Sequence, residues 1–320
     1  MKIRKILALI LASSLILSLG ACAKPAQRPD AKVRIAGLKG PTSMGLVKLM
    51  DNEKYEFTLA GSADEVTPLL LKGELDMAAV PANLAAVLYN NSDGQIVTLA
   101  VNTLGVLSLL EKGNTVQEIK DLKGKTIYAT GKGSTPEYTL RYLLSTAGID
   151  PDHDVTIEFK AEPAEVVALL QNENGIAMLP QPYATAALTQ TEGLRLVLDI
   201  SEAWDALVPE SRLITGVLAA RKDFVEKYPE AVTEFLAEYK TSTEWVNESN
   251  EEASQLIEKY GITKAAIAKK ALPHCNIVFL SGAEMKQVLG GYLTILYGQN
   301  PKAVGGKLPA DDFYAIPAAK

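Results

Sequence analysis

A glycine-rich loop, GKGST at residues 131–135, follows a short apolar run and precedes a helical pattern. Such a loop can hold a phosphate, because free backbone N–H groups at a helix start point toward an anion. A P-loop requires Gly-Lys followed by Ser or Thr, whereas Lys132 is followed by Gly133. A dinucleotide loop requires a third glycine where Pro136 stands. The spacing therefore excludes both kinds of nucleotide loop.

The same residues are typical of a helix N-terminus. Ser134 or Thr135 can act as the N-cap, Pro136 fits the first helical positions, and Glu137 falls in the first turn. A strongly anionic ligand here would meet the Glu137 carboxylate at close range. We therefore expect a zwitterionic or neutral aromatic ligand, or one whose anion docks at KGPTS, residues 39–43. Lys39 and Lys132 flank these loops and would restore positive potential.

Catalytic chemistry has no recognisable motif in this chain. There is no G-x-S-x-G or H-E-x-x-H motif, and the two His residues, His153 and His274, lie far apart. Cys275 follows His274 directly and precedes an apolar run, so we expect a buried core residue rather than a metal ligand. We predict a protein that is not an enzyme and that uses no cofactor or metal.

Polar and glycine residues recur where predicted strands end, which is where open α/β sheets bind ligands. Most of these ends lead into helices, so free N–H groups and the positive end of the helix dipole point there. The alternative for each Ser, Thr or Asn is an ordinary helix cap. Tyr138 and Tyr183 are expected to clamp a flat ligand. The predicted binding residues are Thr42, Ser43, Met44, Asn83, Asn102, Thr103, Gly133, Ser134, Thr135, Tyr138, Gln181, Tyr183 and Thr215.

Two parts of the chain share one order of elements. Strand-like runs at 33–38 and 126–129 each lead into a Gly-rich loop and a helix. A second strand follows at 55–59 and at 155–159, and then a helix opens near Glu65 and near Glu165. Each part closes with an apolar strand that ends in proline, at Pro81 and Pro180, before a third helix. This alternation predicts an α/β protein with two similar lobes and mainly parallel, mixed sheets flanked by helices.

The second lobe is expected to be inserted into the first. The run at 104–109 would pass outward, and the apolar run at 211–221 would return. Lobe I then comprises 32–103 and 217–320, and lobe II comprises 104–216. The expected hinge consists of Thr103–Gly105 and Thr215–Val217, because two crossings allow the lobes to rotate. Four helices are expected after residue 228, with apolar residues at three- and four-residue spacings.

The N-terminus has the layout of a secretory signal peptide, with basic residues before an apolar run at 6–19. A transmembrane anchor is the alternative, but the run is shorter than the ~20 residues that a spanning helix needs. Leu19 to Cys22 resembles a bacterial lipobox. We predict a signal peptide at 1–21, a lipid on Cys22, and a flexible tether at 22–31, which would hold the protein on the outer face of the cytoplasmic membrane.

Charge excludes some partners. Without residues 1–21 the chain carries 29 basic and 38 acidic residues, a net charge of −9. This disfavours nucleic acid and anionic membrane surfaces as partners. Only two Cys exist, and with Cys22 assigned to lipid no intramolecular disulfide is expected.

Several segments together resemble the solute-binding proteins of ABC importers, of the nitrate/sulfonate/taurine and thiamine-precursor type (NMT1-like). They are DLKGKTIYATGKGST at 121–135, ARKDFVEKYPEAVTEFLAEY at 220–239, the apolar strand DMAAVP at 76–81, and Cys22. The likeness covers nearly the whole mature chain. It implies the two-lobe periplasmic-binding-protein (type II) fold, with a ligand cleft that closes by hinge motion.

The resemblance also implies partners. A monomer would deliver a sulfonate, a nitrate-like ion, a carboxylate or a small aromatic such as a pyrimidine to ABC permease and ATPase subunits. Two alternatives stay open: a lipoprotein sensor that feeds a membrane kinase, and a binding-fold enzyme of pyrimidine biosynthesis, which export and a lipid anchor disfavour.

Overall fold

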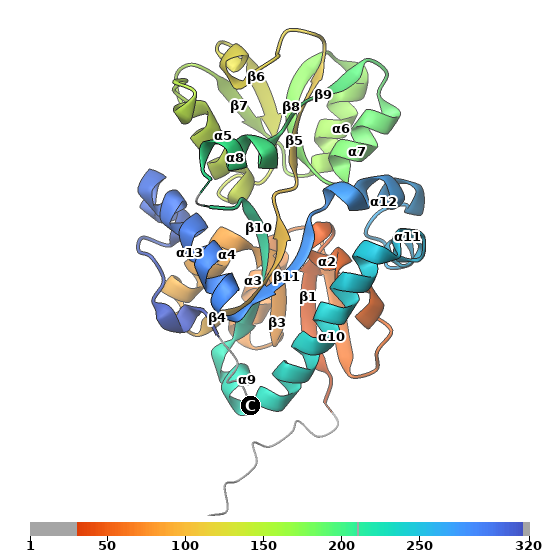
Figure 1. The fold of residues 1–320 in the computed structure, drawn as a ribbon, viewed down its shortest axis with the longest axis vertical. Helices are drawn as coiled ribbons and strands as arrows, with labels where there is room; N and C mark the ends of the chain where they lie inside the picture. The colour runs from red at the N-terminus through yellow and green to blue at the C-terminus, as the bar shows by residue number, and fades with distance from the viewer. Residues whose placement is uncertain (1–30, 210, 316–320) are drawn as a thin grey trace, which may run out of the picture.

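Two lobes, each built on its own sheet, are arranged one above the other along the long axis of the molecule (Figure 1). The computed structural model describes residues 31–209 and 211–315. The signal peptide, the lipid on Cys22 and nearly all of the tether lie outside the described residues. We call the lobe with the six-stranded sheet lobe I and the lobe with the five-stranded sheet lobe II.

The sheet of lobe I has the strand order β11-β4-β10-β3-β1-β2. Its strands are β1 (Val33–Leu38), β2 (Tyr55–Ala60), β3 (Met77–Pro81), β4 (Ile96–Leu104), β10 (Ile214–Arg221) and β11 (Ile277–Ser281). β1 runs parallel to β2 and β3, whereas β10 and β11 run antiparallel to their neighbours. Alternate residues of β1 face opposite sides, so Ile35 and Ala36 pack into different hydrophobic clusters.

The sheet of lobe II has the order β7-β6-β8-β5-β9. Its strands are β5 (Leu107–Lys112), β6 (Thr126–Ala129), β7 (Thr156–Phe159), β8 (Gly175–Pro180) and β9 (Leu194–Asp199). β6 is parallel to β7 and β8, and β5 is antiparallel to β8 and β9. The prediction of mixed sheets is confirmed. Parallel pairs are fewer than expected, because the strands next to the crossings between the lobes run antiparallel.

The predicted repeat is visible in the topology. The order β3-β1-β2 in lobe I matches β8-β6-β7 in lobe II, with the same parallel directions. The helices also correspond: α3 (Ala63–Lys72) and α4 (Ala82–Asn91) match α6 (Pro163–Asn172) and α7 (Tyr183–Gln190).

The repeat fails at one helix. α5 (Thr135–Thr146) has 12 residues, but its counterpart α2 (Pro41–Met44) has only 4 and is followed by a 3-10 turn, η1 (Val47–Leu49). Gly45 lies between them, and a side chain there would come within 3.0 Å of Thr243 Oγ1 and 3.3 Å of the Tyr239 ring. The close approach of α10 (Pro229–Glu248) therefore accompanies the break in this helix.

The four helices predicted after residue 228 are confirmed. They are α10, α11 (Asn250–Lys259), α12 (Ala265–Ala271) and α13 (Gly282–Gln299). α10 covers one face of the lobe I sheet through Phe235 and Tyr239, and α13 covers the other through Leu289 and Leu293. The remaining short elements are α8 (Ile200–Leu207), α9 (Lys222–Lys227), η2 (Ile119–Leu122), η3 (Leu272–His274), η4 (Pro301–Val304) and η5 (Asp311–Phe313).

The chain crosses between the sheets at Gly105 and Val106, and again after α8, where the described residues are 208–209 and 211–213. The two crossings touch, because a Cβ on Gly105 would lie 2.2 Å from Ser201 Oγ and 2.9 Å from Leu213 Cδ2. Asn276 braces the first crossing: its carbonyl accepts from the Leu104 N–H at 3.1 Å, and its Nδ2 donates to the Gly105 carbonyl at 2.5 Å. The segment 215–217, expected as the second hinge, lies inside β10, since its apolar, β-branched run pairs with β4.

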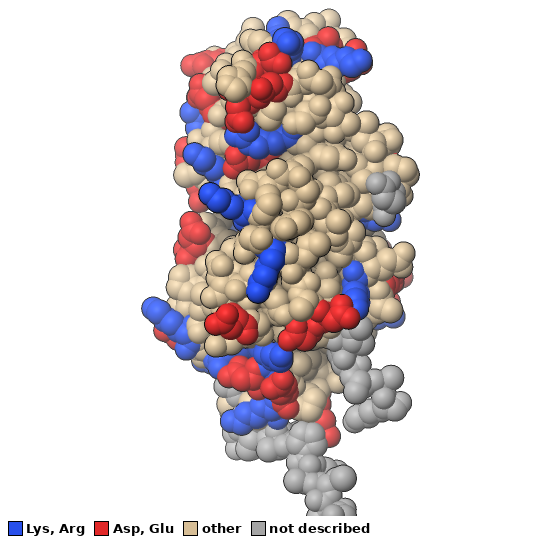
Figure 2. All heavy atoms as spheres, turned by 90° about the vertical axis from the view of Figure 1, so that its left-hand side faces the viewer, with Lys and Arg blue, Asp and Glu red and all other residues tan. Residues whose placement is uncertain are grey.

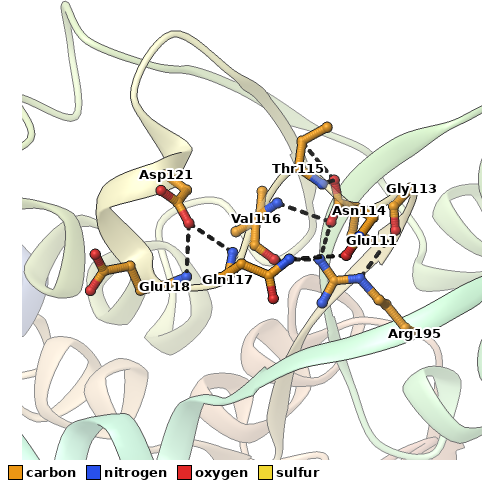
Figure 3. A network of polar contacts seen from close by, with 9 residues as sticks. All are labelled: Glu111, Gly113, Asn114, Thr115, Val116, Gln117, Glu118, Asp121 and Arg195. Atoms are coloured by element: carbon orange, nitrogen blue, oxygen red, sulfur yellow. Dashed lines mark hydrogen bonds and ion pairs between the residues drawn. The ribbon is translucent and has the colours of Figure 1, made fainter.

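A buried ion pair fixes the far end of lobe II (Figure 3). The Glu111 carboxylate is 2 % exposed and binds the Arg195 guanidinium. It also accepts from the Thr115 N–H at 2.8 Å, from Thr115 Oγ1 at 2.6 Å and from the Val116 N–H at 3.2 Å. Arg195 donates in turn to the carbonyls of Gly113 and Val116. Every strong hydrogen-bonding direction of this carboxylate is used, so the loop after β5 is held in one conformation.

The side of the molecule that carries α13 and α4 has a broad uncharged area, with charged side chains mainly toward its ends and rim (Figure 2). The sequence accounts for this, because α4 contains no charged residue and α13 has none from Gln287 to its end. Among the described residues, no helix is both long enough and apolar enough to cross a membrane.

Candidate ligand-binding site

The loop ends of the two lobes meet at Asn83, the second residue of α4. Its Nδ2 donates to the Gly133 carbonyl of lobe II at 3.3 Å and to the Ala303 carbonyl of lobe I at 3.1 Å. Thr135 Oγ1 lies 3.5 Å from Asn83 Oδ1. Asn83 is 1 % exposed. The structure thus brings three of the predicted binding residues into one contact between the lobes.

A second group of predicted residues surrounds Gly216 in lobe I. Asn102 Nδ2 donates to the Thr42 carbonyl at 3.4 Å, and Thr103 Oγ1 donates to Asn102 Oδ1 at 3.0 Å. A Cβ on Gly216 would lie 2.5 Å from Thr42 Cγ2 and 2.6 Å from Asn102 Oδ1. Glycine at this position therefore lets α2 approach the ends of β4 and β10.

Several buried hydroxyls in this region have no hydrogen-bond partner among the described residues. They are Thr42 Oγ1, Ser43 Oγ and Thr215 Oγ1. Ser43 Oγ lies against the β1 backbone, at 2.0 Å from where a Cβ of Gly37 would be. Buried polar atoms are usually paired, since an unpaired one costs about 1–3 kcal/mol. The three oxygens are themselves buried, so a bound molecule would reach them only after the surrounding side chains move.

The glycine-rich loop forms the helix start that the sequence predicts. Ser134 is the N-cap of α5, with Pro136 and Glu137 in the first turn, although Ser134 Oγ donates to the Gly131 carbonyl at 2.8 Å. Gly131 and Gly133 have φ of 74° and 75°, a left-handed conformation that favours glycine.

The Glu137 carboxylate accepts a hydrogen bond from a backbone N–H of the glycine-rich loop. Its Oε2 accepts from the Gly133 N–H at 2.7 Å, and its Oε1 accepts from Arg141 Nε at 2.9 Å. Glu137 is 9 % exposed. The N–H group best placed for an anion is thus already bound to a carboxylate, whose charge Arg141 balances.

Three other predicted residues lie elsewhere. Met44 is fully buried in a hydrophobic cluster with Val47 and Ile257, inside lobe I. Tyr138 and Tyr183 pack against different hydrophobic clusters. Burial raises the pKa of both phenols, and the carboxylates of Glu137 and Glu162 add to the effect on Tyr138 and Tyr183 respectively.

Aromatic rings add a contact between the lobes that the sequence analysis missed. The Trp204 ring of α8 lies 5.0 Å from Tyr142 of α5 and 5.6 Å from Tyr292 of α13, between ring centroids. Burial raises the pKa of Tyr292 to about 12, and the hydroxyls of Thr135 and Thr139 partly oppose this. The interface between the lobes therefore joins rings, an amide and hydroxyls.

A cavity of about 460 Å³ lies on the other side of the crossings, between α7 of lobe II and the α12–η3 segment of lobe I. Gln181 is the predicted binding residue that lines it. Six further polar side chains in its wall were missed by the sequence analysis. They are Ser108, Thr185, Thr189, Asp199, Lys270 and His274. The sequence analysis considered His274 only as a neighbour of Cys275. The four-residue spacing from Gln181 to Thr185, which places both on one face of a helix, could have indicated that Thr185 lines the same wall.

Metal chemistry finds no support among the described residues, since no group of three or more His, Cys, Asp or Glu side chains could hold an ion. Cys275 is buried in the same cluster as Ile277, as predicted, and burial raises the pKa of its thiol.

Comparison with known families identifies the family of this chain. Residues 53–260, more than half of the chain, match the NMT1-like family. The chain belongs to this family. No curated protein matches the sequence.

Solved structures similar to this NMT1-like protein share its fold. A crystal structure of an ABC transporter from Parabacteroides distasonis has 25% identity and a TM-score of 0.75, covering 91% of this chain and 100% of the other. The periplasmic aliphatic sulphonate binding protein SsuA from Escherichia coli has 18% identity and a TM-score of 0.70, covering 90% and 92%. The periplasmic nitrate-binding protein NrtA from Synechocystis PCC 6803 has 15% identity and a TM-score of 0.60, covering 77% and 70%. The type II periplasmic-binding-protein fold is thereby confirmed.

Proposed function

We propose that this protein captures a small molecule between its two lobes and delivers it to the permease of an ABC importer. The contact at Asn83 carries the proposal, because it joins loop ends that follow parallel strands in both lobes. Unpaired hydroxyls lie beside the lobe I loop ends. The sulfonate- and nitrate-binding proteins of the same fold support a transport role.

Closure is the working step of this proposal. The lobes rotate about Gly105–Val106 and about residues 208–209 and 211–213, where the chain passes between the sheets, rather than about 215–217. The boundaries 32–103 with 217–320 and 104–216 then shift slightly at the second crossing, to include all of β10 in lobe I. A ligand drives closure only if it binds the closed form better than the open form.

The protein acts outside the cytoplasm as a monomer that a lipid on Cys22 holds at the outer face of the cytoplasmic membrane. The lipobox-like sequence from Leu19 to Cys22 supports this part. Cys22→Ala is expected to move the protein from the membrane fraction to the soluble extracytoplasmic fraction. Retention of the variant in the membrane would contradict the lipid anchor.

A thermal-shift screen of the purified mature chain tests the binding role. The panel holds sulfonates, nitrate, carboxylates, zwitterions and pyrimidines. At least one class is expected to raise the unfolding temperature, because a molecule that binds only the folded state stabilises it in proportion to ln(1 + [L]/Kd). The proposal fails if no small molecule stabilises the protein.

A further inference from the structure

We propose that the ligand is a small zwitterion and that it binds in the cavity between α7 and α12, with its ammonium group at Asp199 and its acidic group at Lys270 and His274. This inference rests on the proposed function and names the ligand class for it. It places the charged ends of the ligand on opposite lobes, since Asp199 ends β9 of lobe II, and Lys270 and His274 belong to the α12–η3 segment of lobe I.

The cavity has the size and the wall of a binding pocket. Its volume of about 460 Å³ falls within the roughly 300–1,000 Å³ of small-molecule pockets. Three neutral polar side chains in the wall are nearly buried: Ser108 and Gln181 are each 6 % exposed and Thr185 is 8 % exposed. Val106, Leu188 and Leu196 supply an apolar surface. A polar ligand with a short carbon skeleton would match both the polar side chains and the apolar surface of the wall.

Gln181 is held as an oriented donor. Its Oε1 accepts from Thr185 Oγ1 at 2.7 Å and from the Thr185 N–H at 3.3 Å, which fixes the direction of the amide. The backbone N–H of Gln181 donates to the Val106 carbonyl at 2.9 Å. Among the described residues no acceptor takes a hydrogen bond from Nε2. The wall therefore presents a preorganised NH₂ group that needs an acceptor, which the acidic end of a ligand supplies.

The Asp199 carboxylate is also held in place, and only one of its two oxygens has a hydrogen-bond partner among the described residues. Its Oδ1 accepts from the Ser201 N–H at 2.7 Å and from the Glu202 N–H at 3.3 Å, as the N-cap of α8. Its Oδ2 accepts from no described residue. A neighbouring cavity of about 300 Å³ shares both Asp199 and His274, and its wall holds Arg212 as well as Glu202 and Asp205. The unpaired Oδ2 of Asp199, rather than an excess of acidic side chains, is therefore what suits an ammonium group.

The opposite wall carries a cation, Lys270, and an imidazole, His274. Both side chains are exposed and make no ion pair with any described residue, whereas the adjacent Lys269 is bound to Glu251. A purely anionic ligand would satisfy Lys270 and His274 but face Asp199, and a purely cationic ligand would do the reverse. A zwitterion pairs with both walls at once and bridges the lobes.

The glycine-rich loop provides a separate argument against a bare anion as the ligand. Its Gly133 N–H is taken by Glu137, so the anion-binding position of that loop is occupied by the protein's own carboxylate. Among the described residues no Lys or Arg is buried: Lys270 in the cavity wall is exposed, as are Lys39 and Lys132 beside the Asn83 cluster. The α7–α12 cavity differs from that cluster in being lined by both a lysine and a carboxylate whose Oδ2 has no described partner.

Isothermal titration calorimetry on the mature chain tests the ligand class. The probes are α-amino acids, taurine, glycine betaine and ω-amino acids of two to six carbons, each compared with the acid that lacks the amine and the amine that lacks the acid. One zwitterion is expected to bind at least about 30-fold more tightly than either matched compound, since each matched compound leaves one wall of the cavity without its charged partner.

Three charge-neutralising variants and one control test the residues. Asp199→Asn keeps an N-cap oxygen and removes the charge. It is expected to reduce the preference for the zwitterion over the matched acid at least about tenfold, a change in selectivity that misfolding does not produce. Lys270→Gln and His274→Gln are expected to reduce the preference over the matched amine. Lys269→Gln, next in sequence and outside the cavity wall, is expected to leave both ratios unchanged.

The outcomes separate the two proposals. If no compound of any class binds, the proposed function fails and this inference fails with it. If the chain binds an anion or an uncharged compound better than every zwitterion, the inference is overturned and the solute-binding role stands. It is also overturned if a zwitterion binds with equal selectivity to wild type and to Asp199→Asn and Lys270→Gln.

Discussion

The loop after β5 and the junction of the two lobes treat buried polar groups in opposite ways. Around Glu111 both carboxylate oxygens have partners, as do the donors of Arg195 that face them (Figure 3). At the junction, Thr42 Oγ1 and Thr215 Oγ1 are buried without partners among the described residues. A saturated network stabilises one conformation. Buried hydroxyls without described partners also occur away from the junction, for example at Thr98 and Thr191, so the comparison concerns how firmly each region is held rather than where a ligand binds.

The largest expected effect comes from breaking the saturated network. Arg195→Ala leaves the Glu111 carboxylate buried and without its cation, so we expect a loss of about 2–4 kcal/mol in the free energy of unfolding. Urea unfolding followed by circular dichroism measures it. The control is Lys54→Ala, which removes the ion pairs of an exposed lysine to Glu234 and Glu238 and should destabilise the protein far less, because water screens an exposed pair. Equal losses in the two variants would show that the network contributes nothing special.

The next effect concerns the contact between the lobes. Asn83→Ala removes hydrogen bonds to both Gly133 and Ala303, with an expected cost of about 1–2 kcal/mol. Asn90→Ala on the same helix removes bonds only within lobe I, to Val304 and Lys307. Small-angle scattering of the ligand-free chain is expected to show a larger radius of gyration for Asn83→Ala alone. An identical scattering profile in both variants would argue against Asn83 as a link between the lobes.

Two isosteric substitutions compare the junction with the Glu111 network through smaller changes in the free energy of unfolding. Thr42→Val removes a hydroxyl without a partner among the described residues, so stability is expected to change by no more than about 0.5 kcal/mol. Thr42 is not in the wall of the α7–α12 cavity, so the affinity for a ligand bound there is expected to stay unchanged. Thr115→Val removes a donor to Glu111 and is expected to cost about 1 kcal/mol without changing affinity. Urea unfolding and calorimetric titration with the best ligand measure both. If Thr42→Val destabilises as much as Thr115→Val, the Thr42 hydroxyl has a structural partner.

The smallest effect is a pH dependence. Burial alone would raise the pKa of Glu111, but hydrogen bonds from Thr115, Val116 and Arg195 outweigh it and hold the pKa below its usual 4.5. A carboxyl with a lowered pKa stabilises the fold above its unfolded pKa, and this contribution is lost as the pH falls through the folded value. Between pH 6 and pH 3, Glu111→Gln is therefore expected to lose less stability than wild type in urea titrations. Parallel loss in both proteins would refute the assignment.

Local patterns predicted the elements well. The strands that begin at Val33 and Thr126 and the strands that end in Pro81 and Pro180 occur where expected, because alternation, β-branching and proline act over a few residues. The helix start at Ser134 follows from the same short-range chemistry. The i, i+4 spacing of Glu137 and Arg141 was also visible in the sequence, although the charge balance it creates was not used.

Contacts between the lobes were beyond the reach of local patterns. Gln181 and His274 line one cavity although 93 residues separate them, and only the packing of α7 near α12 brings them together. Met44 was placed at the site because it follows a strand, but the short α2 turns its side chain into the core of lobe I. Strand ends indicate a region of the fold, and the direction of each side chain depends on neighbours distant in sequence.

The position of Val33 has a mechanical consequence. The described chain enters lobe I through β1, whose first residue lies about 20 Å from the loop that follows Leu38, at ~3.3 Å per residue. β1 is hydrogen-bonded on both edges, to β2 and β3. A pull applied through a membrane attachment ahead of Val33 would therefore load these two ladders in shear, within lobe I. Lobe II would carry none of that tension and would remain free to swing while the protein is held in place.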